Sequence, residues 1–372
     1  MNIGRLQEEM DRAVAAGVFP GGVLLAARGS QVAATITAGR LEYSLKASPV
    51  RTETIYDLAS LTKVLSTAIL TMIFLEQGRF GLESSLKQLW PGRVPPDKRG
   101  LTLTQLLSHT SGLPAWRPYF EVLNQVPIGK HRTRMAELIL EEPLESEPGK
   151  RSEYSDLNFI LLGLILEEIA QARQEQLFEE LVARPLGLKR TGYRPMDRKN
   201  LASAGSIAPT EDCPDRGGVL KGEVHDKNAW ALSGVAGHAG LFGTAGEVWR
   251  IMASLRASFR HEPGSRLVLK HIVQSFWLWE SQAISLNSAL GFDRPVENDS
   301  AAGHYFSRAS VGHLGFTGAS LWYDPDQDLT VILLTNRVHP SSTNEAIKKF
   351  RPFIHDLVFE KLVGKRLVRG NF

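Results

Sequence analysis

The chain of 372 residues is long enough for one large domain or two. Hydrophobic residues make up 43% and charged residues 22%, so apolar side chains suffice for a sizeable core. The net charge of +3 comes from 43 basic against 40 acidic residues, a mixture typical of a solvated surface and not of a nucleic-acid-binding face. We therefore expect a small-molecule substrate and no nucleic-acid partner.

The sequence carries no sign of export or of a membrane span. Cys213 is the only cysteine, so no intrachain disulfide can form. The first 19 residues hold three acidic side chains in a helical pattern, whereas a secretory signal needs a basic start and an unbroken apolar core. The longest apolar stretch, 68–75, is interrupted by Thr71 and is too short to cross a bilayer. These features predict a cytoplasmic protein, and they leave its oligomeric state open.

Apolar spacing predicts strands near both ends of the chain and helices between them. A helix over 1–19 is followed by strands over 23–27 and 32–37. The segment 60–77 is apolar on nearly all faces and is expected to be a buried helix. The remaining predictions are helices over 103–107, 135–140, 157–170 and 175–182, an irregular segment over 191–232, strands over 309–316, 319–323 and 329–335, and a closing helix over 342–363.

This order of elements predicts an α+β fold. We expect an antiparallel sheet flanked by helices, built from residues 1–75 and 240–372. Residues 76–239 are expected to form a mainly helical domain that ends in a long irregular loop over 191–239.

Ser60 and Lys63 are the first residues that point to chemistry. A serine is a weak nucleophile until a base accepts its proton, and a lysine one helical turn later lies on the same face. Burial and the helix dipole are both expected to lower the pKa of Lys63, which would make its neutral amine a general base. The Ser60 amide, at the helix N-terminus, can point at a developing oxyanion. The same pattern recurs at 84–87, where Ser84 or Ser85 is expected to cap a helix and Lys87 to be exposed.

Two later segments carry side chains that fit the same reaction. Tyr154 precedes the expected helix 157–170, where it either shares proton transfer with a lysine or only anchors its loop, with Asp156 as the helix N-cap. His313 lies in the segment 312–318, whose glycines let a substrate backbone approach closely. A backbone amide just beyond it can be a second oxyanion donor.

In their order and separations these segments resemble the three motifs of the serine β-lactamases and DD-peptidases. They read Ser-x-x-Lys from Ser60, Tyr-Ser-Asp from Tyr154 and His-Leu-Gly from His313. The segments 106–113 and 334–337 are typical of the class C-like branch, so the similarity covers essentially the whole chain. The resemblance implies a mixed α/β domain, an all-helical domain and a catalytic serine in the cleft between them.

The resemblance also implies a role for each matching residue. Ser60 would be the acylated nucleophile, Lys63 its base and Tyr154 the residue that protonates the leaving group. The backbone amides of Ser60 and Phe316 would form the oxyanion hole. No cofactor is implied. The residues that would bind the substrate beside this group are Asp156, His313 and Gly315.

A further resemblance narrows the family. The segments 224–229 and 234–242 are similar to a subgroup of penicillin-binding-protein-like hydrolases and muramyl-L-alanine amidases of cell-wall recycling. Glycine recurs at every third residue over 234–246, which indicates either a tightly packed loop or a functional one. In the functional interpretation His225, Asp226 and His238 lie at the rim of the cleft and contact the substrate.

Two departures from the family pattern bear on the substrate. Asp156 stands where many relatives have asparagine, and its negative charge would favour the protonated form of Lys63. His313 replaces the lysine of the third motif and is cationic only part of the time near neutral pH. Both departures argue against efficient β-lactam turnover.

The sequence therefore predicts a serine hydrolase that forms an acyl-enzyme. The subgroup resemblance favours an amide of a peptidoglycan-derived peptide as substrate, and a carboxylesterase acting on short acyl esters is the alternative. A penicillin- or peptide-binding sensor without turnover is the alternative of another class. A zinc hydrolase is disfavoured, because His225, Asp226 and His238 are its only clustered ligands and no His-Glu-x-x-His helix exists.

Overall fold

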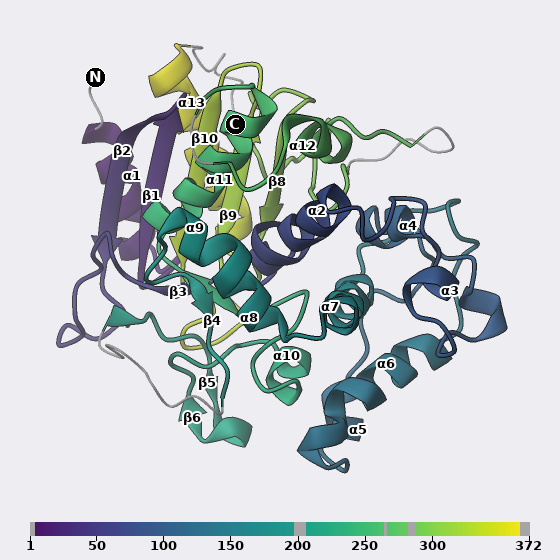
Figure 1. Ribbon diagram of the computed structural model, residues 1–372. Coiled ribbons are helices and arrows are strands. Elements are labelled where there is room, and N and C mark those ends of the chain that lie inside the picture. The colour runs from purple at the N-terminus through teal and green to yellow at the C-terminus, as the bar shows by residue number, and fades with distance from the viewer. Residues whose placement is uncertain (1–3, 197–205, 264–265, 282–287, 365–372) are drawn as a thin grey trace.

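A five-stranded antiparallel sheet joins the two ends of the chain. The computed structural model describes residues 4–196, 206–263, 266–281 and 288–364. Within these residues the sheet has the order β2-β1-β10-β9-β8, so the first and last parts of the chain pair at its centre (Figure 1). The α+β prediction is confirmed, and so are the predicted strands, apart from small differences at their ends. The strands are β1 (Gly21–Arg28), β2 (Gln31–Gly39), β8 (Val311–Leu314), β9 (Ser320–Asp324) and β10 (Leu329–Thr335).

Both faces of this sheet are apolar, because successive residues of a strand point to opposite sides. In β1, Val23 and Leu25 belong to the larger core, and Leu24 and Ala26 belong to a second core. The helices α1 (Gly4–Ala15) and α13 (Ile347–Val363) cover the second core. The helix α11 (Ala245–Phe259) packs against β1 and β10 on the side of the larger core.

The closing helix begins at Ile347, later than the predicted start at residue 342. The Asn344 amide group donates to Gly17 O at 2.9 Å, and Asn344 Oδ1 accepts from Ala346 N at 3.1 Å. These contacts tie the segment before the helix to the loop after α1, which replaces the expected first turn of helix.

Most of the remaining helices lie to one side of the sheet (Figure 1). The predicted helix 60–77 is a π-helical segment, Lys63–Thr67, followed by α2 (Ala68–Glu76). The predicted helix 175–182 is α8 (Gln174–Phe178), continued by π-helical residues Glu179–Ala183. The other helices are α3 (Leu86–Leu89), α4 (Leu103–Leu107), α5 (Tyr119–Leu123), α6 (His131–Glu141), α7 (Asp156–Ala170), α9 (Arg184–Leu186), α10 (Lys227–Ala231) and α12 (Lys270–Trp277).

Two smaller sheets are built from short strands. The order of the second sheet is β3-β7-β4, from β3 (Tyr56–Asp57), β7 (Leu241–Gly243) and β4 (Gly192–Tyr193). A two-stranded ribbon, β5 (Asp212–Cys213) and β6 (Gly218–Val219), lies within the segment predicted to be irregular. Residues 197–205 of that segment lie outside the described residues. The predicted division into two domains stays a prediction.

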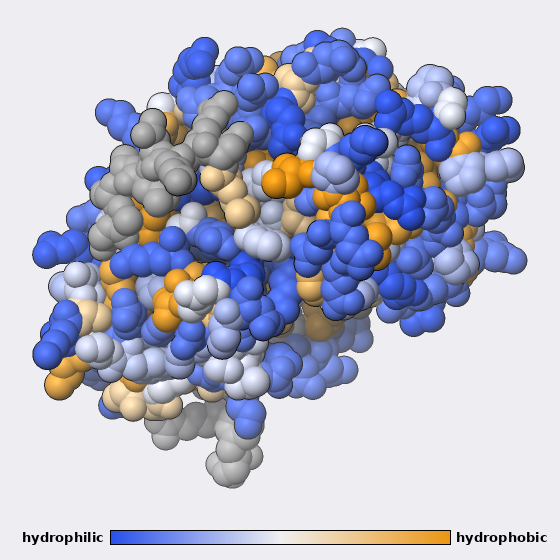
Figure 2. Space-filling view, turned by 90° about the horizontal axis from the view of Figure 1, so that it is seen from below, coloured by the Kyte–Doolittle hydropathy of each residue, from blue (hydrophilic) through white to orange (hydrophobic). Residues whose placement is uncertain are grey.

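The face of the molecule in Figure 2 is mostly hydrophilic, and apolar residues appear on it as small groups between hydrophilic ones. Small apolar groups of this kind are ordinary on the surface of a globular protein and identify no docking face on the side shown. No helix within the described residues is both long enough and apolar enough to cross a bilayer.

Gly237 lies against the main chain of α7. A Cβ atom there would lie 2.0 Å from Phe159 O and 3.0 Å from Gly163 N. Gly234 and Gly240 of the same run have φ angles of +86° and +114°, which favour glycine over residues that carry a Cβ. Close packing and tight turns therefore explain the glycine run at these three positions.

Gly237→Ala is expected to lower the free energy of unfolding by about 3 kcal/mol, because the added methyl group meets backbone atoms that cannot rotate away. Urea unfolding measures the change. Gly246→Ala is the matched control: it lies in α11 with open space around its position, so the substitution should be neutral or stabilise by up to about 1 kcal/mol. Equal losses in the two variants would contradict the packing argument.

Candidate active site

Ser60 lies in a strained turn between β3 and the helix that contains Lys63. Ala59 has a φ angle of +48°, a conformation that residues other than glycine seldom adopt. Its amide donates to Asp57 Oδ1 at 2.8 Å. Such strain is concentrated at functional sites, because the surrounding contacts must enforce it. Helical structure begins at Leu61 and becomes π-helical at Lys63, and π-helical turns are frequent at functional sites as well.

Lys63 contacts the nucleophile candidate directly. Its Nζ lies 2.9 Å from Ser60 Oγ, as the sequence predicts, and its side chain is fully buried. The same Nζ donates to Asp156 Oδ1 at 2.7 Å and to His238 O at 3.4 Å. Three oxygens therefore surround one ammonium group.

The pKa of Lys63 is raised, so the predicted lowering is wrong. Burial alone would lower it, but the charges of Asp156 and Tyr154 and hydrogen bonds to both side chains outweigh burial. Burial and the helix dipole predict a lowered pKa and the charge of Asp156 predicts a protonated Lys63, and in the folded site the charge prevails. At neutral pH the resting site therefore contains a protonated Lys63 paired with Asp156.

Tyr154 lies on the other side of Lys63. Its ring centroid is 4.9 Å from Lys63 Nζ, and burial of its hydroxyl raises the pKa to about 12, against hydrogen bonds from Lys63 and Ser60. The residue as a whole is 43% exposed, and its hydroxyl lies within hydrogen-bond reach of Lys63 and Ser60. The N-cap of α7 is Ser155 and not the predicted Asp156. The Ser155 hydroxyl accepts from Asn158 N at 3.4 Å. Asp156 is thereby free to face Lys63.

Two buried histidines flank the Tyr154 ring. The ring centroids of His109 and His313 lie 4.9 Å and 5.8 Å from that of Tyr154. Burial lowers the pKa of both imidazoles, and the charge of Lys63 lowers both further. His313 Nδ1 lies 2.7 Å from Leu314 O, which fixes the proton on Nδ1. His313 is therefore neutral, and the site lacks the fixed cation that a lysine would supply there.

Within the part of the chain that the structure describes, the two backbone amides predicted to form the oxyanion hole have no competing acceptor. Among the described residues neither Ser60 N–H nor Phe316 N–H donates to a backbone or side-chain oxygen. Phe316 as a whole is 54% exposed. Gly315, beside it, is required by packing, since a Cβ atom there would lie 2.8 Å from Leu58 O.

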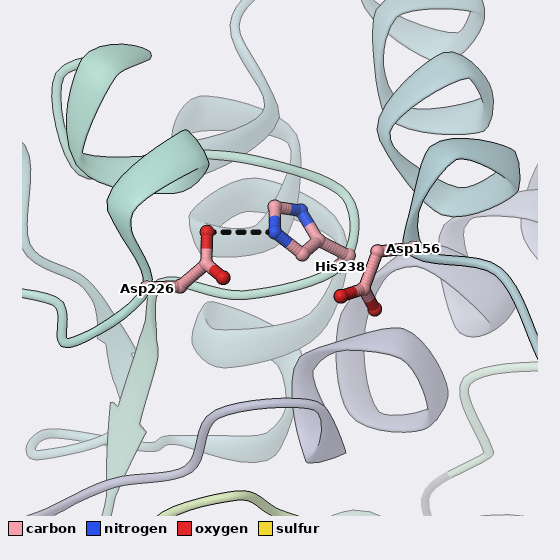
Figure 3. Close-up of side chains that lie close together, drawn as sticks. All are labelled: Asp156, Asp226 and His238. Atoms are coloured by element: carbon pink, nitrogen blue, oxygen red, sulfur yellow. Dashed lines mark hydrogen bonds and ion pairs between the residues drawn. The ribbon is translucent and has the colours of Figure 1, made fainter. Parts of the chain in front are cut away.

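Asp226 and His238 form a pair behind Asp156. His238 Nε2 lies 2.8 Å from Asp226 Oδ1, and Figure 3 shows the His238 ring with Asp226 and Asp156 on either side. Burial would raise the pKa of Asp226, but the His238 contact holds it well below its usual range. His238 is 1% exposed, so its predicted position at the rim of the cleft is wrong. It lies inside because the glycine run packs against α7. His225 and Asp226 keep partly exposed side chains.

Asp156, Asp226 and His238 are also the group within the described residues that best resembles a metal site, with ligand atoms within 4.8 Å of one another. Lys63 already contacts Asp156 at 2.7 Å and supplies the positive charge that this group needs. A metal ion would have to displace that ammonium. The zinc alternative gains no support from this arrangement, because an open site needs three ligands free of such a competitor.

Two residues near the reaction centre escaped the sequence analysis. His109 lies in the segment 106–113, which served only as a family marker, and its φ angle of +58° could not be inferred from its residue type. Asp57 has no motif of its own, although it lies only three positions before Ser60 in the sequence. The burial of its carboxylate and the amides that it contacts are seen only in the folded structure.

Comparison with known families identifies the chain. The sequence model of the Beta-lactamase family matches residues 6–351. The protein therefore belongs to the beta-lactamase family, as the three motifs predict. It is a serine hydrolase of the kind that cleaves amide or ester bonds through an acyl-enzyme.

Two curated relatives are similar over most of their length. The chain is 29% identical over 367 residues to an N-acetylmuramyl-L-alanine amidase of Bacillus subtilis (strain 168), covering 90% of this chain and 81% of the relative. It is 28% identical over 316 residues to a putative D-alanyl-D-alanine carboxypeptidase of Escherichia coli (strain K12), covering 80% of this chain and 72% of the relative.

Solved structures share the fold. The octameric penicillin-binding protein homologue from Pyrococcus abyssi has a TM-score of 0.74 at 19% identity, covering 98% of this chain and 78% of that one. EstCE1, a hydrolase with promiscuous acyltransferase activity, has a TM-score of 0.70 at 23% identity, covering 94% and 98%. At these identities the likeness concerns the fold alone.

Proposed function

We propose that the protein is an amidase for peptides derived from peptidoglycan, with Ser60 as the acylated nucleophile. The observation that carries the proposal is the 2.9 Å contact between Ser60 Oγ and Lys63 Nζ, beside the Tyr154 ring. In the first step Ser60 attacks the amide carbonyl, and the backbone amides of Ser60 and Phe316 stabilise the oxyanion. Lys63 takes the Ser60 proton, and Tyr154 gives a proton to the leaving amine and regains one from Lys63. Water then releases the acid.

Lys63 must lose its proton before it can accept that of Ser60. The Asp156 contact makes the neutral amine a minor form at neutral pH, so its population limits the rate of acylation. Bound substrate excludes water from the pair, and a drier site lowers the free energy of two neutral groups relative to two charged ones. Asp156 thus restrains the reaction.

A neutral His313 favours the amidase activity of one relative over the carboxypeptidase activity of the other. A D-alanyl-D-alanine carboxypeptidase or a β-lactamase must bind a substrate carboxylate, and a fixed cation beside the third motif would serve that purpose. Arg337 is near, but its guanidinium lies over the Phe316 ring and donates to Phe316 O, Ser342 O and Asn344 O. An amide without a neighbouring carboxylate fits this site better.

The remaining expectations are part of the same proposal. His225 and Asp226 are proposed to contact the substrate, because their side chains are 15% and 25% exposed beside the reaction centre. The cleft between a sheet domain and a helical domain is the proposed place of binding. Action on peptidoglycan fragments in the cytoplasm is likewise proposed.

A substrate panel tests the proposed function. It contains a muramyl peptide with an intact lactyl–L-alanine amide, a peptide ending in D-alanyl-D-alanine, a β-lactam and a p-nitrophenyl ester, with products identified by mass spectrometry. We expect the muramyl peptide to give the highest kcat/KM and the β-lactam to acylate slowly. Faster release of D-alanine would favour a carboxypeptidase, and turnover of the ester alone would favour the carboxylesterase. A fluorophosphonate or penicillin adduct without hydrolysis of any substrate would contradict all three.

A further inference from the structure

A buried carboxylate lies directly behind the turn that carries Ser60. Asp57 is the last residue of β3 and is 2% exposed. Burial raises its pKa, although hydrogen bonds from the amides of His225 and Ala59 act in the other direction. Burying a carboxylate costs free energy unless its oxygens are well hydrogen-bonded. The contacts of Asp57 therefore indicate what this buried carboxylate holds in place.

Three contacts of Asp57 reach three different segments of the chain. Its Oδ1 accepts from Ala59 N at 2.8 Å, and its Oδ2 accepts from His225 N at 2.8 Å. Its main-chain oxygen accepts from Thr317 Oγ1 at 2.7 Å. One residue therefore joins the nucleophile turn, the loop before α10 and the turn after β8.

Two of these contacts lie one residue away from the amides of the proposed oxyanion hole. Ala59 precedes Ser60, and its contact with Asp57 helps to hold the positive φ angle of the turn. Thr317 follows Phe316 directly, so the hydrogen bond from its hydroxyl to Asp57 O holds the backbone next to the Phe316 amide. The third contact supports the same place, because the His225 ring stacks on Phe316 with centroids 5.5 Å apart and planes inclined by 23°.

We propose that Asp57 is a positioning residue that aligns the two amides of the oxyanion hole with each other. The inference rests on the proposed function, since it presumes that Ser60 N and Phe316 N stabilise the oxyanion. Stabilisation of this kind depends on donors held in advance at hydrogen-bond distance from the developing charge. The two amides belong to segments more than 250 residues apart in the sequence, and Asp57 contacts the neighbours of both.

Asp57→Asn tests the proposal with little change in size. An asparagine side chain has one oxygen, so its NH2 group would face either Ala59 N–H or His225 N–H, and one contact would be lost. We expect kcat for acylation to fall by about 10- to 100-fold, less than the loss of a whole oxyanion donor, while KM stays within about twofold. Titration with a fluorophosphonate counts the folded sites, so kcat is expressed per active enzyme.

A second readout separates alignment from general stability. The ratio of kcat/KM for an ester over the thionoester of the same acyl group measures hydrogen bonding to the oxyanion, because sulfur is a weak acceptor. This ratio should fall in Asp57→Asn. Asp324→Asn is the matched control: Asp324 is 0% exposed and accepts from the amides of Ser307, Asp326 and Gln327 at 2.8, 2.9 and 3.2 Å, away from the site. The control should lose stability and keep both kcat and the ratio.

The Thr317 hydroxyl provides a second test if Asp57→Asn does not fold. Thr317→Ser keeps the donor to Asp57 O and should keep the ester-to-thionoester ratio, whereas Thr317→Val removes the donor and should lower it. An unchanged ratio in both Asp57→Asn and Thr317→Val, with turnover still dependent on Ser60, would overturn the positioning role. Turnover that survives Ser60→Ala would instead remove the proposed function, so the two failures are distinguishable.

Discussion

Ser60→Ala and Lys63→Met are each expected to lower kcat/KM for amide and ester substrates by about 10⁴-fold or more, and the double variant should be no slower than either. The two side chains act as one unit, since the hydroxyl reacts only after Lys63 takes its proton across 2.9 Å. Ser60→Ala should also abolish the mass shift of the acyl-enzyme. Burst kinetics with a p-nitrophenyl ester and intact-mass spectrometry measure both effects.

The chain contains its own control for this prediction. Ser84 and Lys87 repeat the Ser-x-x-Lys spacing, but Ser85 is the N-cap of α3 and Lys87 is exposed. Ser84→Ala and Lys87→Met should leave kcat/KM within about twofold, as is usual for surface changes away from a site. Losses in Ser60→Ala and Lys63→Met that add in the double variant would show that the residues act independently, contrary to the proposed mechanism.

The elements of the fold were predictable where burial leaves a periodic signal. The strand 329–335 was predicted with its observed bounds, because a run of β-branched and apolar residues begins directly after a turn rich in aspartate. The π-helical segment at Lys63–Thr67 was not predicted, because one added residue in a helical turn does not change apolar spacing over so short a stretch. It depends on contacts such as Thr67 Oγ1 to Gly237 O at 2.6 Å.

The candidate site was predictable in its motifs but only in part in its electrostatics. The spacing of Ser60 and Lys63 required their contact once a helix formed. The raised pKa of Lys63 depends on a carboxylate 93 positions later, and the distance between the two is set by the packing of α7. Asp57 carries no sequence signal, because its function comes from amides that belong to distant loops. Residue type indicates chemistry, whereas protonation and alignment need the folded neighbours.

Asp156→Asn is expected to increase acylation at neutral pH. The carboxylate is the main contribution that holds the pKa of Lys63 above its ordinary value against burial. Without it burial dominates and the pKa falls below that value. The ascending limb of the kcat/KM profile, which reports loss of the Lys63 proton, should then move to lower pH by about 1–3 units. Because the neutral amine is the reactive form, kcat/KM at pH 7 should rise about tenfold for each unit.

The free energy of unfolding provides an independent check on the role of Asp156. A raised lysine pKa in the folded protein means that the ion pair stabilises the fold below the ordinary lysine pKa and that this stabilisation is lost as pH rises through the raised value. Asp156→Asn should therefore be less stable than the parent at pH 7, and the difference should shrink at strongly alkaline pH.

Asp97→Asn is the matched control for Asp156→Asn. It removes the carboxylate that lies 2.6 Å from Lys98 Nζ, outside the site, and should leave the pH profile in place. If Asp156 itself accepted the proton of Ser60, its replacement would instead lower kcat/KM at every pH without moving the ascending limb to lower pH. The direction of the change at pH 7 thus decides whether Asp156 restrains Lys63 or acts as the base, because the two roles require opposite signs.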